Sequence, residues 1–183
     1  PGAGPEPIWL GGEGANRADL NRVPREVGGE GKVGEGVDLR HVPSALELNI
    51  SCPNVKRGGM EFGVDPKMTR ELTGRLRQLT TRFLMVKLSP NVTDIGAIAQ
   101  AVEDGGADAV SAINTVVGMD VDPRTGRYLV GTGLCGLSGP AIRPIALANV
   151  YKVAQAVTIP VIGLGGIMTA EDVVSFVRVG AQA

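Results

Sequence analysis

The stretch FLMVKLSP, residues 83–90, decides the fold class, because an apolar run of strand length ends there on a single amine. Lys87 follows four apolar residues and comes shortly before the Ser89-Pro90 break. Carboxyl-terminal strand ends are where an α/β barrel collects its active site. Three other runs also end on chemically useful residues: LELNISCPN at 46–54, AVSAINT at 109–115 and IPVIGLGG at 159–166. A thiol, an amine, amides and a glycine pair on four separate strands therefore predict a βα-barrel enzyme.

The segments between these runs carry helix signals. Asp65 with Pro66 and Thr93 with Asp94 are natural helix starts, and residues 169–172 approximate a capping box. The first helix is expected to pack through a stripe at helical spacing: Met68, Leu72, Leu76 and Leu79. Alternating strands and helices predict a parallel sheet.

One long excursion interrupts this alternation after residue 115. Residues 118–122 and 127–130 flank a turn at 123–126, so we expect a hairpin over the mouth of the barrel. Cys135 follows in a glycine-rich loop, and no catalytic role is expected for it.

The chain is short for this pattern. An eight-stranded βα barrel usually needs about 250 residues, whereas 183 residues contain about four βα units. We interpret residues 44–183 as a partial TIM-barrel domain. Residues 1–43 are rich in Gly, Glu, Arg and Pro without apolar periodicity, so they are expected to be disordered, either as an aberrant leader or as a natural tail.

Composition excludes several classes of function. The 18 basic and 19 acidic residues nearly cancel and form no basic stripe, so we expect neither nucleic acid nor a membrane surface as partner. Two cysteines without an apolar leader indicate a reduced, cytoplasmic protein. Neither the cysteines nor His41 has the spacing of a metal site, so no metal is expected. A small molecule is the expected partner.

Five motifs, in this order along residues 44–183, resemble the core of dihydroorotate dehydrogenase. They are NISCPN at 49–54, VKLSPNVTD at 86–94, INT at 113–115, GLSGP at 136–140 and GLGGI at 163–167. Cys52 is similar to the cysteine of the class 1 enzymes, where class 2 has serine. The loop at 58–63 and residues 117–120 are most similar to class 1B.

The resemblance implies oxidation of dihydroorotate to orotate with FMN as hydride acceptor, in pyrimidine biosynthesis. A base must remove the C5 proton while the flavin takes the C6 hydride, and the resemblance makes Cys52 that base. It also implies an FAD and iron–sulfur partner subunit that uses NAD, and a homodimer core in the full-length enzyme.

The resemblance also assigns binding residues. Substrate contacts would come from Asn49, Asn54, Asn114 and Thr115. FMN contacts would come from Lys87, Ile113, Gly139, Gly165 and Gly166. Lys87 would stabilise the anionic reduced flavin, and the glycines would let backbone amides approach its ribityl or phosphate oxygens.

The residues also allow other interpretations. Cys52 could be a small buried hydrophobe, and Lys87 a strand-end lysine that extends to solvent. The pyrimidine-reducing domain of dihydropyrimidine dehydrogenase shares the cysteine loop and the lysine strand, and a Schiff-base lyase would use Lys87 as its nucleophile. A non-enzyme hypothesis is an inactive fragment whose exposed sheet edges aggregate.

Overall fold

The computed structural model describes residues 44–50 and 59–183, and Cys52, Asn54 and His41 lie outside them. Four parallel strands form the central sheet in the order of the chain, β1-β2-β3-β6. They are β1 (Ala45–Asn49), β2 (Phe83–Leu88), β3 (Ala109–Ala112) and β6 (Val161–Gly163). The helices are α2 (Gly59–Val64), α3 (Pro66–Leu79), α4 (Ile95–Asp104), α5 (Arg143–Ala156) and α6 (Ala170–Arg178).

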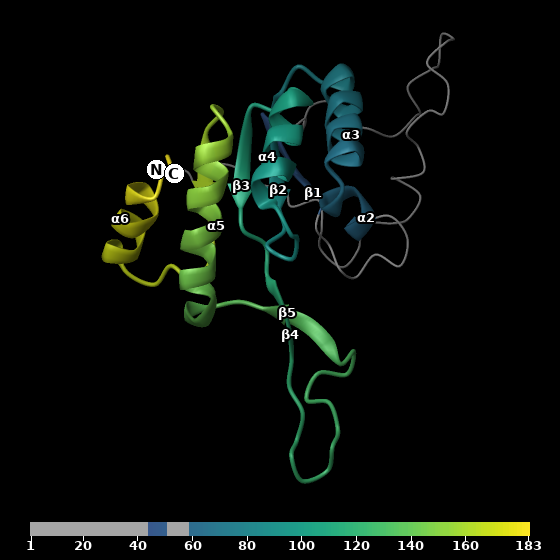
Figure 1. Cartoon of the computed structure of the whole chain (residues 1–183), viewed down its shortest axis with the longest axis vertical. Helices are drawn as coiled ribbons and strands as arrows, with labels where there is room; N and C mark the ends of the chain where they lie inside the picture. The colour runs from purple at the N-terminus through teal and green to yellow at the C-terminus, as the bar shows by residue number, and fades with distance from the viewer. Residues whose placement is uncertain (1–43, 51–58) are drawn as a thin grey trace, which may run out of the picture.

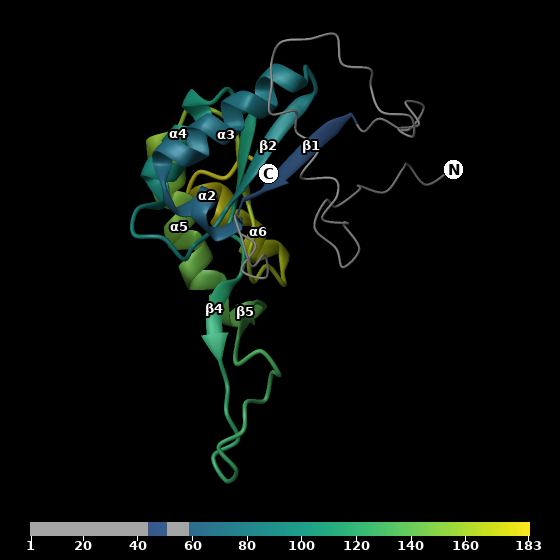
Figure 2. The same cartoon turned by 90° about the vertical axis from the view of Figure 1, so that its right-hand side faces the viewer.

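The order of the strands identifies the sheet as part of a barrel wall. Helices α3, α4 and α5 lie side by side along one face of the sheet (Figures 1 and 2). A doubly wound sheet would reverse its strand order and carry helices on both faces. The last residues run beside β6, where the Gln182 amide donates to the Val161 carbonyl at 2.8 Å and the Gly163 amide to the Ala183 carbonyl at 2.7 Å. The predicted partial barrel is confirmed.

The predicted helix starts are confirmed. Asp65 Oδ1 accepts the Met68 amide at 2.8 Å, and Asp94 Oδ1 accepts the Ala97 amide at 3.1 Å. Residues 169–172 form a complete capping box at α6. These caps join residues that are three positions apart, so the local sequence is sufficient to specify them.

The apolar stripe predicted for α3 is wrong in part. Leu79 is 64% exposed, whereas the buried positions of α3 are Thr69 and Thr73. The Thr73 hydroxyl donates to the Thr69 carbonyl at 2.8 Å, and the Thr69 hydroxyl donates to the Phe62 carbonyl, so both hydroxyls are satisfied. A β-carbon on Gly105 would lie 2.6 Å from Thr73 Cβ, which shows how closely the end of α4 packs here. Small residues let the two helices approach.

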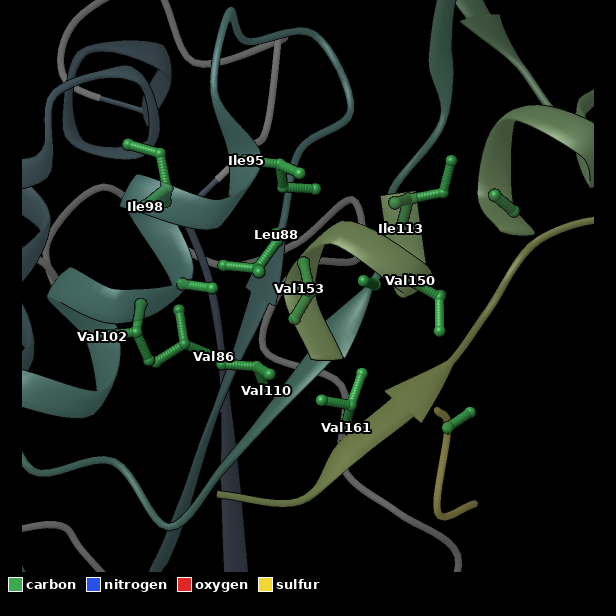
Figure 3. Packing of buried hydrophobic residues seen from close by; sticks show 14 of the residues in the cluster. Val86, Leu88, Ile95, Ile98, Val102, Val110, Ile113, Val150, Val153 and Val161 are labelled. Atoms are coloured by element: carbon green, nitrogen blue, oxygen red, sulfur yellow. The ribbon is translucent and has the colours of Figure 1, made fainter. Parts of the chain in front are cut away.

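The hydrophobic core lies between the sheet and the helices. Val86, Leu88 and Val110 are fully buried and lie close to the residues of α4 and α5 (Figure 3). Each such side chain contributes about 1.5–3 kcal/mol of transfer free energy. The helical side of the core is supplied by Ile95, Ile98, Ala99, Val102, Ala146, Val150 and Val153.

The predicted hairpin is present: around the turn at 123–126, Val121 bridges Tyr128, the Asp122 amide donates to the Arg127 carbonyl at 2.9 Å and the Leu129 amide to the Asp120 carbonyl at 3.0 Å. Closer to the sheet, β4 (Val116–Met119) pairs antiparallel with β5 (Leu134–Leu137), a strand that was not predicted. In both views the hairpin extends away from the sheet (Figures 1 and 2). Cys135 lies on β5 as a half-buried free thiol, 3.6 Å from the Gly118 carbonyl.

Candidate functional site

Asn49 and Lys87 lie side by side at the carboxyl-terminal edge of the sheet. They are register partners on β1 and β2, and Lys87 is in turn the register partner of Ser111 on β3. Side chains alternate between the faces of a strand, and Val86 and Leu88 are buried in the core against the helices. Asn49, Lys87 and Ser111 therefore share the opposite face, which is the inner face of a barrel.

Glu47 and Ser111 form a polar pair on this inner face. The Ser111 hydroxyl donates to Glu47 Oε1 at 2.5 Å, and Ser111 is fully buried. Partial burial of a carboxylate on this face costs free energy unless a hydrogen-bond donor such as Ser111 faces it. Sequence reasoning missed this pair, although a glutamate that interrupts an apolar strand was a visible signal.

Asn114 connects the third strand to the first. Its Nδ2 donates to Asn49 Oδ1 at 3.3 Å, and its Oδ1 accepts the Thr115 amide at 2.7 Å. All three residues are half-buried. The structure thus brings together Asn49, Asn114 and Thr115, three of the four residues expected to bind substrate.

The backbone beyond β3 keeps the sheet pairing for two more residues. The Ile113 amide donates to the Leu164 carbonyl at 3.0 Å, and the Asn114 amide donates to the Leu88 carbonyl at 2.9 Å. Ile113 is buried, and a β-carbon built on Gly165 would lie 3.6 Å from Ile113 Cγ1. The two residues expected to contact the flavin, Ile113 and Gly165, are therefore neighbours.

The other expected flavin glycines meet at the start of α5. Gly139 and Gly166 both have positive φ, and a β-carbon on Gly166 would lie 2.8 Å from the Gly139 carbonyl oxygen and 2.9 Å from the Arg143 amide nitrogen. Nothing lies within 4 Å of the position that a Gly139 β-carbon would take. The backbone is therefore open at Gly139 and too crowded for a side chain at Gly166. Such a backbone beside a helix start suits a phosphate or ribityl group.

We call the place where Gly139, Gly165 and Gly166 lie near the start of α5 the glycine corner. Arg143 connects this glycine corner to α6. Its Nε lies 2.5 Å from Asp172 Oδ1, and its Nη2 donates to Ser175 Oγ at 2.9 Å. The backbone amides of Met168 and Thr169 also donate to Asp172, and these bonds, led by that from Met168, outweigh burial and hold the pKa of the Asp172 carboxyl below its ordinary value. The residues that follow Gly166 are thus tied to α6 and, through Asp172, to α5.

The expected base is adjacent to this region in sequence. Cys52 and Asn54 lie outside the described residues, so their geometry stays a prediction. Ile50, the last described residue before them, is buried, and its carbonyl oxygen would lie 2.6 Å from a β-carbon on Gly63 of α2. In the sequence, Cys52 and Asn54 therefore follow directly on the strand end that carries Asn49.

Among residues 44–50 and 59–183, no group of three or more His, Cys, Asp or Glu side chains could hold a metal ion. Within the same ranges, no helix combines the length and apolar character needed to cross a membrane.

Comparison with known proteins gives one family. A family model described as dihydroorotate dehydrogenase matches residues 32–183. The chain is also similar to curated proteins named dihydroorotate dehydrogenase B (NAD(+)), catalytic subunit. The relative from Geobacillus kaustophilus is 53% identical over 152 residues, which are 83% of this chain and 49% of the relative. That from Fusobacterium nucleatum is 56% identical over 139 residues, 76% of this chain and 46% of the relative.

The chain spans about half the length of the curated relatives that it matches. Among solved structures, a nitroalkane oxidase from Streptomyces ansochromogenes is 30% identical and covers 67% of this chain and 30% of its own, with a TM-score of 0.37.

Proposed function

The chain belongs to the dihydroorotate dehydrogenase family, and from that premise we propose that it carries substrate-binding and FMN-binding residues of an enzyme that oxidises dihydroorotate to orotate in pyrimidine biosynthesis. The observation that carries the proposal is the contact of Asn114 with Asn49, beside Lys87, at one strand edge. Amides from two strands supply the donors and acceptors that a pyrimidine ring needs.

The roles of the chain's residues follow from the chemistry. Oxidation removes a proton from C5 and a hydride from C6 of dihydroorotate, and Cys52 as thiolate would take the proton. Bound FMN would supply the hydride acceptor. Asn49, Asn114 and Thr115, with Asn54, would orient the ring so that C5 faces the thiolate.

The residues for the flavin would occupy the adjacent part of the edge. Lys87 would place a positive charge near the ring system, and Ile113 would pack against its apolar surface. Gly139, Gly165 and Gly166 would bind the ribityl phosphate at the start of α5, where their geometry leaves room for an anion and not for side chains.

The names of these relatives support a proposal about the partner. They are called NAD(+)-linked catalytic subunits, so we propose that electrons leave through a second subunit with FAD and an iron–sulfur cluster, which uses NAD. A homodimer of catalytic subunits and a cytoplasmic location are part of the same proposal.

The test uses a full-length subunit that contains residues 44–183. Cys52→Ala should keep its FMN and bind orotate but be reduced by dihydroorotate at least ~10²-fold more slowly in stopped-flow measurements, the usual loss for a general base. Cys135→Ala is the matched control, because it removes the second cysteine of the chain, which lies on β5. Its flavin should be reduced at the parental rate. Parental reduction of the Cys52→Ala flavin would disprove the base assignment, and a parent that lacks flavin would disprove the function.

A further inference from the structure

Asn91 lies in the loop after β2 and bonds to the chain just beyond the expected substrate residues. Its Nδ2 donates to the Thr115 carbonyl at 3.0 Å, and its Oδ1 accepts the Val117 amide at 2.9 Å. One side-chain amide thus satisfies a carbonyl and an amide that flank residue 116. A parallel strand forms the same pair of bonds with its neighbour, through its own backbone.

These bonds continue the pairing of β2 with β3 after β2 has ended. The last backbone bond between the two segments joins the Asn114 amide to the Leu88 carbonyl at 2.9 Å. One residue later, at Thr115, the side-chain amide of Asn91 supplies the hydrogen bond in place of the β2 backbone. Asn91 is itself held, because its backbone amide and its Nδ2 both donate to Ser89 Oγ, at 3.1 and 3.3 Å, and Ser89 is buried.

Thr115 is confined from the opposite side as well. A β-carbon on Gly136 of β5 would lie 2.9 Å from Thr115 Cβ and even closer to its hydroxyl, so the hairpin backbone rests directly on this side chain. The Thr115 amide donates to Asn114 Oδ1 at 2.7 Å, and Asn114 Nδ2 in turn donates to Asn49. A displacement of residue 115 would therefore pass straight to Asn114.

We propose that Asn91 is a positioning residue that fixes Asn114 and Thr115 for substrate binding and sets where the hairpin leaves the sheet. This inference rests on the proposed function, because it takes Asn114 and Thr115 to be the substrate residues. Asn91 acts through the backbone of residues 115–117. The effect should fall on the substrate and not on the phosphate end of the flavin, since the expected flavin glycines lie in the segments after β6 and before α5.

The test compares Asn91→Ala and the near-isosteric Asn91→Leu in a full-length subunit. Both variants should exchange the amide hydrogens of residues 115–118 at least ~10-fold faster than the parent and bind orotate at least ~10-fold more weakly. FMN content should stay at the parental level, a separation that a general loss of structure would not produce. The control is Asn149→Ala, which removes an amide whose bond among the described residues stays within α5, to the Ile145 carbonyl at 2.8 Å.

The hydrogen-exchange and orotate measurements distinguish a failure of the positioning role of Asn91 from a failure of the proposed function. Parental exchange at residues 115–118, or parental orotate affinity with faster exchange, would overturn the positioning role. A parent that binds FMN but not orotate would overturn the proposed function, and exchange would then decide by itself whether Asn91 holds the segment.

Discussion

At the scale of the residue, the position of Lys87 is set by its strand. It lies at the carboxyl-terminal end of β2, between Asn49 on β1 and Ser111 on β3. Val86 and Leu88 on either side of it are fully buried, so the backbone of Lys87 is held firmly while its side chain remains half-buried on the other face. An ammonium at such a site favours an anionic ligand, because partial removal from water strengthens the attraction.

Lys87→Ala should therefore weaken FMN binding to a full-length subunit by at least ~10-fold, or about 1.4 kcal/mol. It should also lower the reduction potential of the bound flavin, because the anionic reduced form loses a nearby positive charge. Fluorescence titration and a dye-coupled potential measurement check both effects. Lys152→Ala, on the exposed surface of α5, is the control. A variant with parental flavin content and parental potential would exclude Lys87 as the flavin partner.

At the scale of the element, the residue that caps α6 also bonds to the start of α5, beside the glycine corner. Thr169 and Asp172 cap each other reciprocally, and Asp172 also pairs with Arg143 at the start of α5. One carboxylate thus satisfies amides before α6 and a charge on another helix. Such a carboxylate is favoured in the folded state, which is the reason that the pKa of Asp172 falls.

The sign of the pH dependence follows from this lowered pKa. The stabilisation by Asp172 is fully present above the unfolded pKa, near 3.8, and is lost as the pH falls through the lower folded pKa. An NMR titration should show the amides of Met168 and Thr169 shifting only below pH ~3.8. Asp172→Asn should remove this transition, whereas Glu171→Gln, in the same turn, should keep it. A transition centred above pH ~4.5 would contradict the assignment.

At the scale of the whole molecule, the strand order explains what the chain can form. Four parallel strands in chain order with helices on one face are a barrel wall, and a closed barrel of this class has eight strands. Within the described residues, β1 pairs with β2 alone. The inner face that carries Asn49, Lys87 and Ser111 would be enclosed only by further strands.

The 183-residue chain should accordingly bind FMN at least ~100-fold more weakly than a full-length subunit, a difference of about 2.8 kcal/mol. Part of the flavin's surroundings in a closed barrel would come from strands beyond the four described. Fluorescence titration of monodisperse chain with FMN measures this, with riboflavin as the control for the phosphate contribution. Submicromolar FMN binding by the chain, with turnover of dihydroorotate, would show that four strands are sufficient.

The amino-acid sequence by itself determined the features that depend on near neighbours. The starts of α3, α4 and α6 were predictable because Asp65, Asp94 and Thr169 bond to amides three residues away. The strands were predictable because buried parallel strands are short apolar runs. Their polar ends were visible too, and the motifs that they form already resembled one family.

Only the tertiary structure decided which distant groups meet. Thr69 and Thr73 occupy the buried side of α3, and Leu79 does not, because the close approach of α4 selects small side chains. Asn91 bonds to residues 24 and 26 positions away, and periodicity within one segment contains no information about such a contact. Contacts of this kind depend on how two loops emerge from adjacent strands, which the packing of the whole sheet determines.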